Sequence, residues 1–119
     1  MKIKLFDSEL RVMDVLWRYG DTTAKRIAEI LKEQVGWSKT TTYTVIKKCI
    51  EKGAIERREP DYICHPLITR GQVQEFETTE LIDKMYDGAA DRLVASLLES
   101  RKLTREEIER LKQLIKDSE

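Results

Sequence analysis

The sequence predicts a mainly α-helical fold with one small β-hairpin, on two observations. Apolar residues recur at helical spacing in six segments, and four of these are followed by glycines that can end a helix, at Gly20, Gly36, Gly53 and Gly88. Between the third and fourth segments, two short runs flank Glu59-Pro60-Asp61, whose residue types favour a turn. The chain has 119 residues, of which 40% are hydrophobic, so it can bury a core.

Three helices are expected before the hairpin. Apolar spacing places the first over residues 8–19, the second up to Gly36, and the third from Ser38 to about Lys52. The start of each helix carries residues that can cap an N-terminus: Asp7 or Ser8, Thr22 or Thr23, and Ser38.

Three further helices are expected after Pro66, which breaks the strand pattern. Two of them cover about 69–87 and 89–100. The last begins at a capping box formed by Thr104 and Glu107 and continues to about Lys116.

This order of elements is typical of a winged helix-turn-helix followed by additional helices. Three helices and a hairpin fall within about 65 residues, which fits that compact motif. We therefore expect two domains, a winged helix over residues 1–68 and a helical domain over 69–119.

The third helix has two chemically different faces, which indicates how it could be used. Its apolar face consists of Val45, Ile46, Cys49 and Ile50. The opposite face is rich in hydroxyl groups and lysines and carries one aromatic ring. The major groove of DNA admits a helix, threonine offers a methyl and a hydroxyl to base edges, and lysine neutralises phosphate. The candidate DNA contacts on this helix are Lys39, Thr40, Thr41, Tyr43, Thr44 and Lys47.

The first hairpin strand carries two further candidate contacts, Arg57 and Arg58. Side chains alternate along a strand, so at most one of these arginines faces a given side. Either could serve as a contact from the wing to the DNA backbone.

The charge balance leaves a second function open. The whole chain carries 22 basic and 22 acidic side chains, whereas proteins dominated by phosphate binding usually have a basic excess. Residues 1–68 carry 13 basic and 10 acidic side chains, and residues 69–119 carry 9 and 12. The pattern alone therefore also fits a winged helix that binds a protein partner and no DNA.

The residue pattern gives no indication of an enzyme, a cofactor or a metal site. There is one histidine and no phosphate-cradling glycine loop. Cys64 and His65 are adjacent, so on a strand they point to opposite faces, and no second pair completes four ligands. Cys49 lies on the apolar face of the third helix and is expected to be a small buried side chain.

A cytoplasmic location is the expectation from the remaining features. The apolar stretch at the N-terminus is too short and too charged for a signal peptide, and no apolar run approaches the length of a membrane span. Cys49 and Cys64 fit no disulfide framework.

Four segments together resemble the penicillinase-repressor family of winged-helix transcriptional regulators (the BlaI, MecI and CopY type). The longest runs from Trp37 to Ile55 and contains the sequence WSKTTTYTVIKKCIEKGAI. The others are ELRVMDVLW in the first helix, LIDKMYDG before the C-terminal helices, and Leu103 to Leu114 in the last helix. The ordered set covers essentially the whole chain.

The resemblance implies a homodimeric repressor that binds a palindromic double-stranded DNA operator. On this view residues 1–68 are the DNA-binding domain and 69–119 the dimerisation domain. The DNA-reading positions of the family fall on Thr40, Thr41, Tyr43 and Thr44. The apolar positions expected in the dimer contact are Leu81, Met85, Leu93, Val94, Leu97, Leu98, Ile108, Leu111 and Ile115.

The chain departs from the family pattern at three places. Tyr43 stands where a basic residue is usual, and a phenol cannot make the bidentate contact that arginine makes to guanine. Members linked to β-lactamase are inactivated when a regulatory protease cuts an Asn–Phe bond in the fifth helix, and the aligned pair here is Ser96–Leu97. Copper-sensing members end in a Cys-x-Cys cluster, which this C-terminal segment lacks. The regulated genes, of the β-lactam-resistance type or another stress type, are not specified by the residues.

Overall fold

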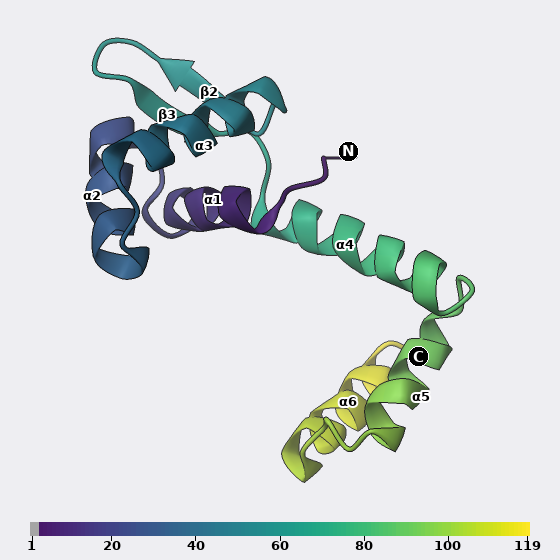
Figure 1. The fold of residues 1–119 in the computed structure, drawn as a ribbon. Helices are drawn as coiled ribbons and strands as arrows, with labels where there is room; N and C mark the ends of the chain where they lie inside the picture. Colours follow the sequence, from purple (N-terminus) through teal and green to yellow (C-terminus); the bar gives the residue numbers. More distant parts are fainter. Residues whose placement is uncertain (1–2) are drawn as a thin grey trace. The chain divides into compact units, whose positions relative to one another are not determined.

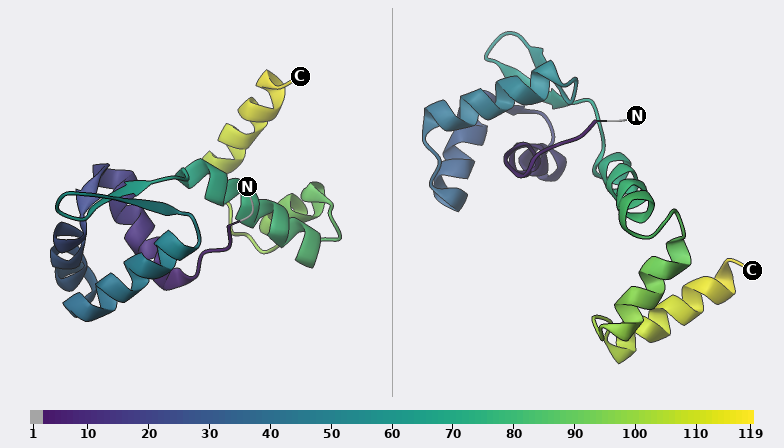
Figure 2. Two further views of the ribbon diagram at one scale, coloured as in Figure 1. Left: turned by 90° about the horizontal axis from the view of Figure 1, so that it is seen from above. Right: turned by 45° about the vertical axis from the view of Figure 1, so that its right-hand side comes forward.

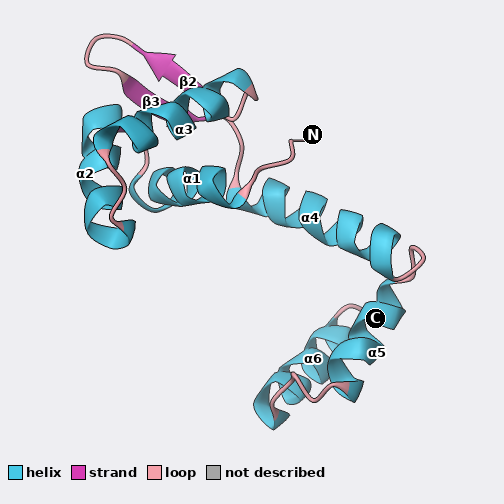
Figure 3. Cartoon of the chain, viewed as in Figure 1, coloured by secondary structure: helices cyan, strands magenta, loops and turns pink. Residues whose placement is uncertain are grey.

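The computed structural model of the protein describes residues 3–119 and contains the expected helices and hairpin (Figure 1; Figure 3). The helices are α1 (Asp7–Tyr19), α2 (Ala24–Val35), α3 (Lys39–Glu51), α4 (Arg70–Met85), α5 (Ala90–Glu99) and α6 (Arg105–Asp117). The strands are β1 (Thr22–Thr23), β2 (Ile55–Arg58) and β3 (Ile63–Pro66). The predicted fold class is thus confirmed.

The chain forms two compact units, one ending at Glu77 and the other covering Thr78–Glu119. The domain boundary expected after residue 68 falls just before α4, whereas the two compact units divide inside this helix. Val73, in the first turn of α4, is only 7% exposed and belongs to the core of the first unit. The start of α4 is therefore part of the winged helix.

The sheet has one more strand than the sequence predicts. Its order is β1-β3-β2, with both pairs antiparallel. Thr22 and Thr23 were expected only as helix caps. Thr23 does cap α2, because its side chain accepts a hydrogen bond from the Arg26 amide at 3.1 Å. Both residues also pair with β3. A strand of two residues is defined by its partner and not by any local pattern.

The N-cap of α1 also differs from the prediction. Neither Asp7 nor Ser8 caps this helix, because the N-cap is Phe6, whose amide donates to Glu9 Oε1 at 2.7 Å. Glu9 is 1% exposed, and Lys52 Nζ at the end of α3 lies 2.6 Å from the same oxygen. The carboxylate therefore ties the start of α1 to the end of α3.

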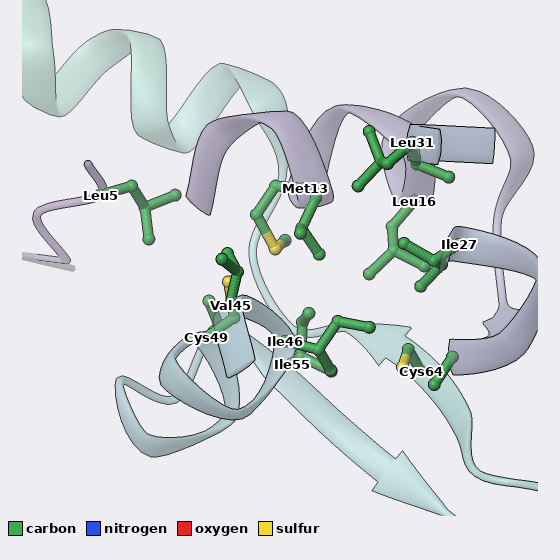
Figure 4. Close-up of a cluster of buried hydrophobic side chains, with 14 of the residues drawn as sticks. Leu5, Met13, Leu16, Ile27, Leu31, Val45, Ile46, Cys49, Ile55 and Cys64 are labelled. Carbon is green, nitrogen blue, oxygen red and sulfur yellow. The ribbon is translucent and has the colours of Figure 1, made fainter. Parts of the chain in front are cut away.

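The core of the first unit is formed by one face of each of α1, α2 and α3, by the hairpin (Figure 4) and by the start of α4. Leu16, Ile27 and Ile46 come from α1, α2 and α3, and each is at most 1% exposed. Ile55 and Cys64 cover this centre from β2 and β3. The hairpin lies beside α3, as the views in Figure 2 show. The predicted burial of Cys49 is confirmed.

The second unit is built differently, because no side chain within residues 78–119 is buried. Its helices are amphipathic, and Thr104 and Glu107 form the predicted capping box at the start of α6. Large apolar side chains remain exposed, among them Met85 (64%) and Ile115 (59%). None of the helices in residues 3–119 combines the length and the apolar character needed to cross a bilayer.

Burial of the two cysteines predicts low thiol reactivity. Burial raises the pKa of the Cys49 thiol to about 12, with the Glu9 carboxylate adding to the effect, and raises the pKa of Cys64 to about 11. Because the thiolate is the nucleophile, we expect iodoacetamide to label neither cysteine rapidly at about pH 8 in the folded protein, and both in guanidinium chloride. Mass spectrometry of the labelled protein measures this, and rapid labelling of the folded protein would contradict it.

The same shifts predict the direction of the pH dependence of stability. The folded pKa values lie above the unfolded value of about 8.5, so the folded state keeps these protons longer. The contribution is fully present below about pH 8.5 and is lost as pH rises through the folded pKa values of about 11 and about 12. The free energy of unfolding is expected to fall in that window.

Candidate nucleic-acid interface

The orientation of α3 is fixed by its buried face. Val45, Ile46 and Cys49 recur at helical spacing and are at most 6% exposed. The opposite side of the helix is exposed and carries most of the predicted contacts. They are Lys39, Thr40, Thr41, Thr44 and Lys47, together with Lys48. The packing of α3 thus presents hydroxyl and ammonium groups on one continuous surface.

The first turn of this surface is held by local hydrogen bonds. Ser38 is the N-cap; its Oγ accepts from the Thr41 amide at 3.1 Å and donates to Thr41 Oγ1 at 3.0 Å. Thr44 Oγ1 donates to the Thr40 carbonyl at 2.9 Å. The hydroxyl proton of Thr44 is therefore used inside the helix, which leaves its methyl and oxygen lone pairs for an outside partner. The N-terminal end of the helix also favours an anion.

Thr42 does not belong to this surface. It lies among the hydroxyl-bearing residues of the sequence between Ser38 and Thr44, but the structure places it in the core with 0% exposure. Its Oγ1 finds no hydrogen-bond partner in the part of the chain that the structure describes. The helical period explains this position, because Thr42 is followed by the buried residues Val45, Ile46 and Cys49 three, four and seven positions later.

Tyr43 is half-buried and connects α3 to the wing. Its ring meets the Tyr62 ring edge to face, with centroids 5.8 Å apart and planes at 88°. Lys39 Nζ lies 5.6 Å from the Tyr43 centroid. Tyr62 was not among the predicted site residues, although an aromatic residue directly after the predicted turn was a signal of a packed wing. Burial raises the pKa of the Tyr62 phenol.

The two wing arginines lie on opposite faces of the hairpin. Arg57 pairs across the sheet with the buried Cys64, and its Cζ lies 3.6 Å from the Tyr62 centroid. Its Nε also lies 2.6 Å from Glu59 Oε1. Arg57 therefore lies on the face of the hairpin that is turned toward the core.

Arg58 is held by carboxylates on the other face. Its Nε lies 2.6 Å from Glu56 Oε1, and its Nη1 lies 3.5 Å from Asp21 Oδ2. The hydrogen bond from Arg58 lowers the pKa of Glu56 and raises that of the arginine. The Asp21 carboxylate also contacts His65, whose Nδ1 lies 2.6 Å from Asp21 Oδ1.

Cys64 and His65 do not converge on a metal site. Cys64 is fully buried, whereas His65 is paired with Asp21 at the surface. Within residues 3–119, no group of three or more histidine, cysteine or carboxylate side chains is arranged to hold a metal ion.

Comparison with known proteins identifies the family. Residues 5–117 match the family model described as penicillinase repressor. The chain belongs to the penicillinase repressor family. This confirms the resemblance seen in the sequence, and the family is one of transcriptional repressors, not of enzymes.

Individual relatives cover nearly the whole chain. The penicillinase repressor of Bacillus licheniformis is 26% identical over 116 residues, which is 96% of this chain and 91% of the relative. The methicillin resistance regulatory protein MecI of Staphylococcus aureus (strain N315) is 27% identical over 114 residues, 94% of this chain and 93% of the relative.

A solved structure supports the winged-helix part of the fold. It is the solution structure of the monomeric form of BlaI from Bacillus licheniformis in complex with the blaP half-operator. It is 29% identical, with a TM-score of 0.52, and covers 59% of this chain and 89% of that chain.

The position of Thr42 predicts a gain in stability. Replacing Thr42 by valine removes a buried hydroxyl without a partner and keeps the shape of the side chain. We expect Thr42→Val to raise the free energy of unfolding by about 1 kcal/mol, measured by urea denaturation followed by circular dichroism. The matched control is Thr41→Val, which removes an exposed hydroxyl that is bonded to Ser38 and should give no such gain. A loss of stability in Thr42→Val would mean that this hydroxyl is satisfied.

Proposed function

We propose that this protein is a sequence-specific DNA-binding repressor that binds a palindromic operator as a homodimer. The observation that carries the proposal is the exposed face of α3, whose threonines and lysines are held outward by the buried opposite face. Membership of a repressor family supports the same function.

Each side chain on this face has a chemical role that suits the major groove. The methyl groups of Thr40, Thr41 and Thr44 can contact thymine methyls, and their hydroxyls can bond to base edges or phosphates. Lys39 and Lys47 neutralise phosphates beside the groove. Tyr43 is half-buried against Tyr62, so only the outer part of its ring can reach DNA.

The wing supplies a backbone contact beside the recognition helix. Arg57 and Arg58 are exposed, and each is paired with a nearby carboxylate. Such exposed pairs are weak, so a phosphate can replace the carboxylate.

The second unit supports the homodimer. Five of the nine predicted contact positions are exposed in the single chain: Leu81, Met85, Val94, Leu98 and Ile115. The other four, Leu93, Leu97, Ile108 and Leu111, are half-buried. A second copy of this unit would cover these side chains and place two copies of α3 on successive half-sites. BlaI in complex with a half-operator is consistent with one chain per half-site.

We further propose that a regulatory protease releases the operator by cutting the second unit. The aligned bond Ser96–Leu97 lies inside α5, and both side chains are half-buried. Ser96 Oγ also accepts a hydrogen bond from Tyr86 at 3.3 Å. A protease that cuts this bond has to unfold α5 first, so cleavage would require opening of the second unit. The names of the relatives, a penicillinase repressor and a methicillin resistance regulatory protein, suggest resistance genes as the targets.

Binding to DNA should depend on both sequence and salt. We expect competitor-resistant binding to DNA from directly upstream of the gene, weakening with salt because bound lysines and arginines release counterions. The double variant Thr41→Ala and Tyr43→Ala should lose roughly 1–3 kcal/mol of specific binding per lost base contact. Fluorescence anisotropy with excess random DNA at two salt concentrations measures both effects.

The control for this experiment is Gln34→Ala, an exposed polar change on α2. If the double variant loses equal affinity for operator and random DNA, these residues do not read bases. Binding that random competitor abolishes, with no dependence on salt, would favour a winged helix that binds a protein.

Dimer formation should depend on Leu97. We expect Leu97→Asp to separate the dimer in sedimentation velocity experiments and to weaken operator binding, because the dimer would bury an unpaired charge at a cost of several kcal/mol. Gln113→Glu adds the same charge at an exposed site of α6 and should stay dimeric. A Leu97→Asp protein that remains dimeric with unchanged affinity would refute this packing.

A further inference from the structure

Four side chains from α3 and the wing form a continuous row, with a cation at each end and two aromatic rings between them. Lys39 lies by the ring of Tyr43, Tyr43 meets Tyr62 edge to face, and Arg57 stacks on Tyr62. The three separations are 5.6, 5.8 and 3.6 Å. The closest contact is therefore the one between the wing arginine and its ring, and Tyr62 is the member that joins the wing to α3.

Tyr62 is fixed by its backbone as well as by its ring. Its φ is +51°, a left-handed conformation that residues with side chains rarely adopt. Its carbonyl accepts a hydrogen bond from the amide of Ala24, the first residue of α2, at 2.9 Å. The first turn of α2 thus sets the position of Tyr62, and a ring held from two directions can orient a side chain stacked on it.

The two wing arginines are not equivalent in this arrangement. Arg57 pairs with Cys64 across the sheet, on the face of the hairpin turned toward the core, and stacks on the ring that contacts α3. Arg58 lies on the outer face between Glu56 and Asp21, where two carboxylates offset its charge. Arg57 has one carboxylate partner, Glu59.

Stacking leaves the guanidinium able to bind an anion. The ring of Tyr62 covers the flat face of Arg57, whereas the N–H donors lie at its edge. A phosphate can therefore take the place of Glu59 in the plane of the guanidinium while the stack stays intact.

We propose that Tyr62 is a positioning residue for DNA binding, which holds Arg57 against the phosphate backbone beside the base pairs that α3 reads. The inference rests on the proposed function and deepens it. It assigns the backbone contact of the wing to Arg57 and not to Arg58, and it gives Tyr62 a role through Arg57 without a base contact of its own.

The test is the salt dependence of binding by the full-length protein. Anisotropy titrations on an operator fragment and on random DNA over a series of salt concentrations give the slope of log affinity against log salt. Loss of one phosphate contact lowers the magnitude of this slope by about 0.9, so a substitution present in both chains of the dimer lowers it by about 1.8. We expect that reduction for Arg57→Gln and for Tyr62→Met, on both DNAs, and no further reduction when the two changes are combined.

Two variants separate positioning from a general structural effect. Tyr62→Phe keeps the aromatic face and should restore the wild-type slope. Arg18→Gln removes an exposed arginine at the end of α1, which is paired with Asp14, and should leave the slope unchanged. Thermal unfolding followed by circular dichroism shows whether each variant is folded, and Tyr62→Leu replaces Tyr62→Met if the latter is not.

The outcomes distinguish failure of the role proposed for Tyr62 from failure of the proposed DNA binding. If the wild-type protein binds neither DNA, the proposed function fails and the inference with it. If the wild-type protein binds operator DNA but Tyr62→Met keeps the full slope, only the role of Tyr62 is refuted. A reduced slope in Arg58→Gln with an unchanged slope in Arg57→Gln would refute the choice of arginine. Additive losses in the double variant would show that Tyr62 does not act through Arg57.

Discussion

Burial of one face of α3 is the constraint on which the remaining features of the winged helix depend. Val45, Ile46 and Cys49 pack into a core shared with α1 and α2, and this fixes the rotation of α3 about its axis. A helix with a fixed rotation presents the same side chains outward in every copy of the protein. The Glu9–Lys52 pair adds a second restraint at the far end of α3, where the buried carboxylate joins it to the start of α1. Recognition by short hydroxyl side chains requires this rigidity, since threonine reaches only a short distance from the backbone.

The zero net charge is compatible with DNA binding because the acidic side chains pair with some of the basic side chains and not with others. The wing arginines and Lys52 each have a carboxylate within 4.0 Å. In contrast, Lys39, Lys47 and Lys48 take part in none of the ion pairs within residues 3–119. In the free protein, acidic residues therefore pair with the wing arginines and Lys52 and leave the α3 lysines available for phosphates. The local potential at a surface, and not the sum over the chain, decides what binds there.

Features that follow a common local pattern could be predicted from the sequence, whereas features with a distant cause or an unusual local one could not. Helical periodicity and caps are local, so the helices, the hairpin and the Thr104 capping box were predicted correctly. β1 exists only because β3 lies beside it, and the cap of α1 depends on Glu9 rather than on a short polar residue at the N-cap. Thr42 resembles its exposed neighbours in chemistry. It differs from them only in lying on the same side of the helix as Val45 and Cys49. Tyr62 was missed because its partners, Tyr43 and Arg57, converge on it only in the folded chain.

The contrast between the two units indicates where the proposed repressor can be controlled. The first unit has its own core, whereas no side chain of residues 78–119 is buried. In the proposed dimer, folding of the second unit and pairing of the two recognition helices are then linked. Operator DNA that binds only the folded dimer stabilises both the folded second unit and the dimer. An agent that opens the second unit would release the operator without touching α3. The two cysteines do not offer such control, since both are buried in the first unit with raised thiol pKa values. In the proposed repressor, proteolysis or a ligand would therefore act on the second unit, several of whose large apolar side chains are left exposed.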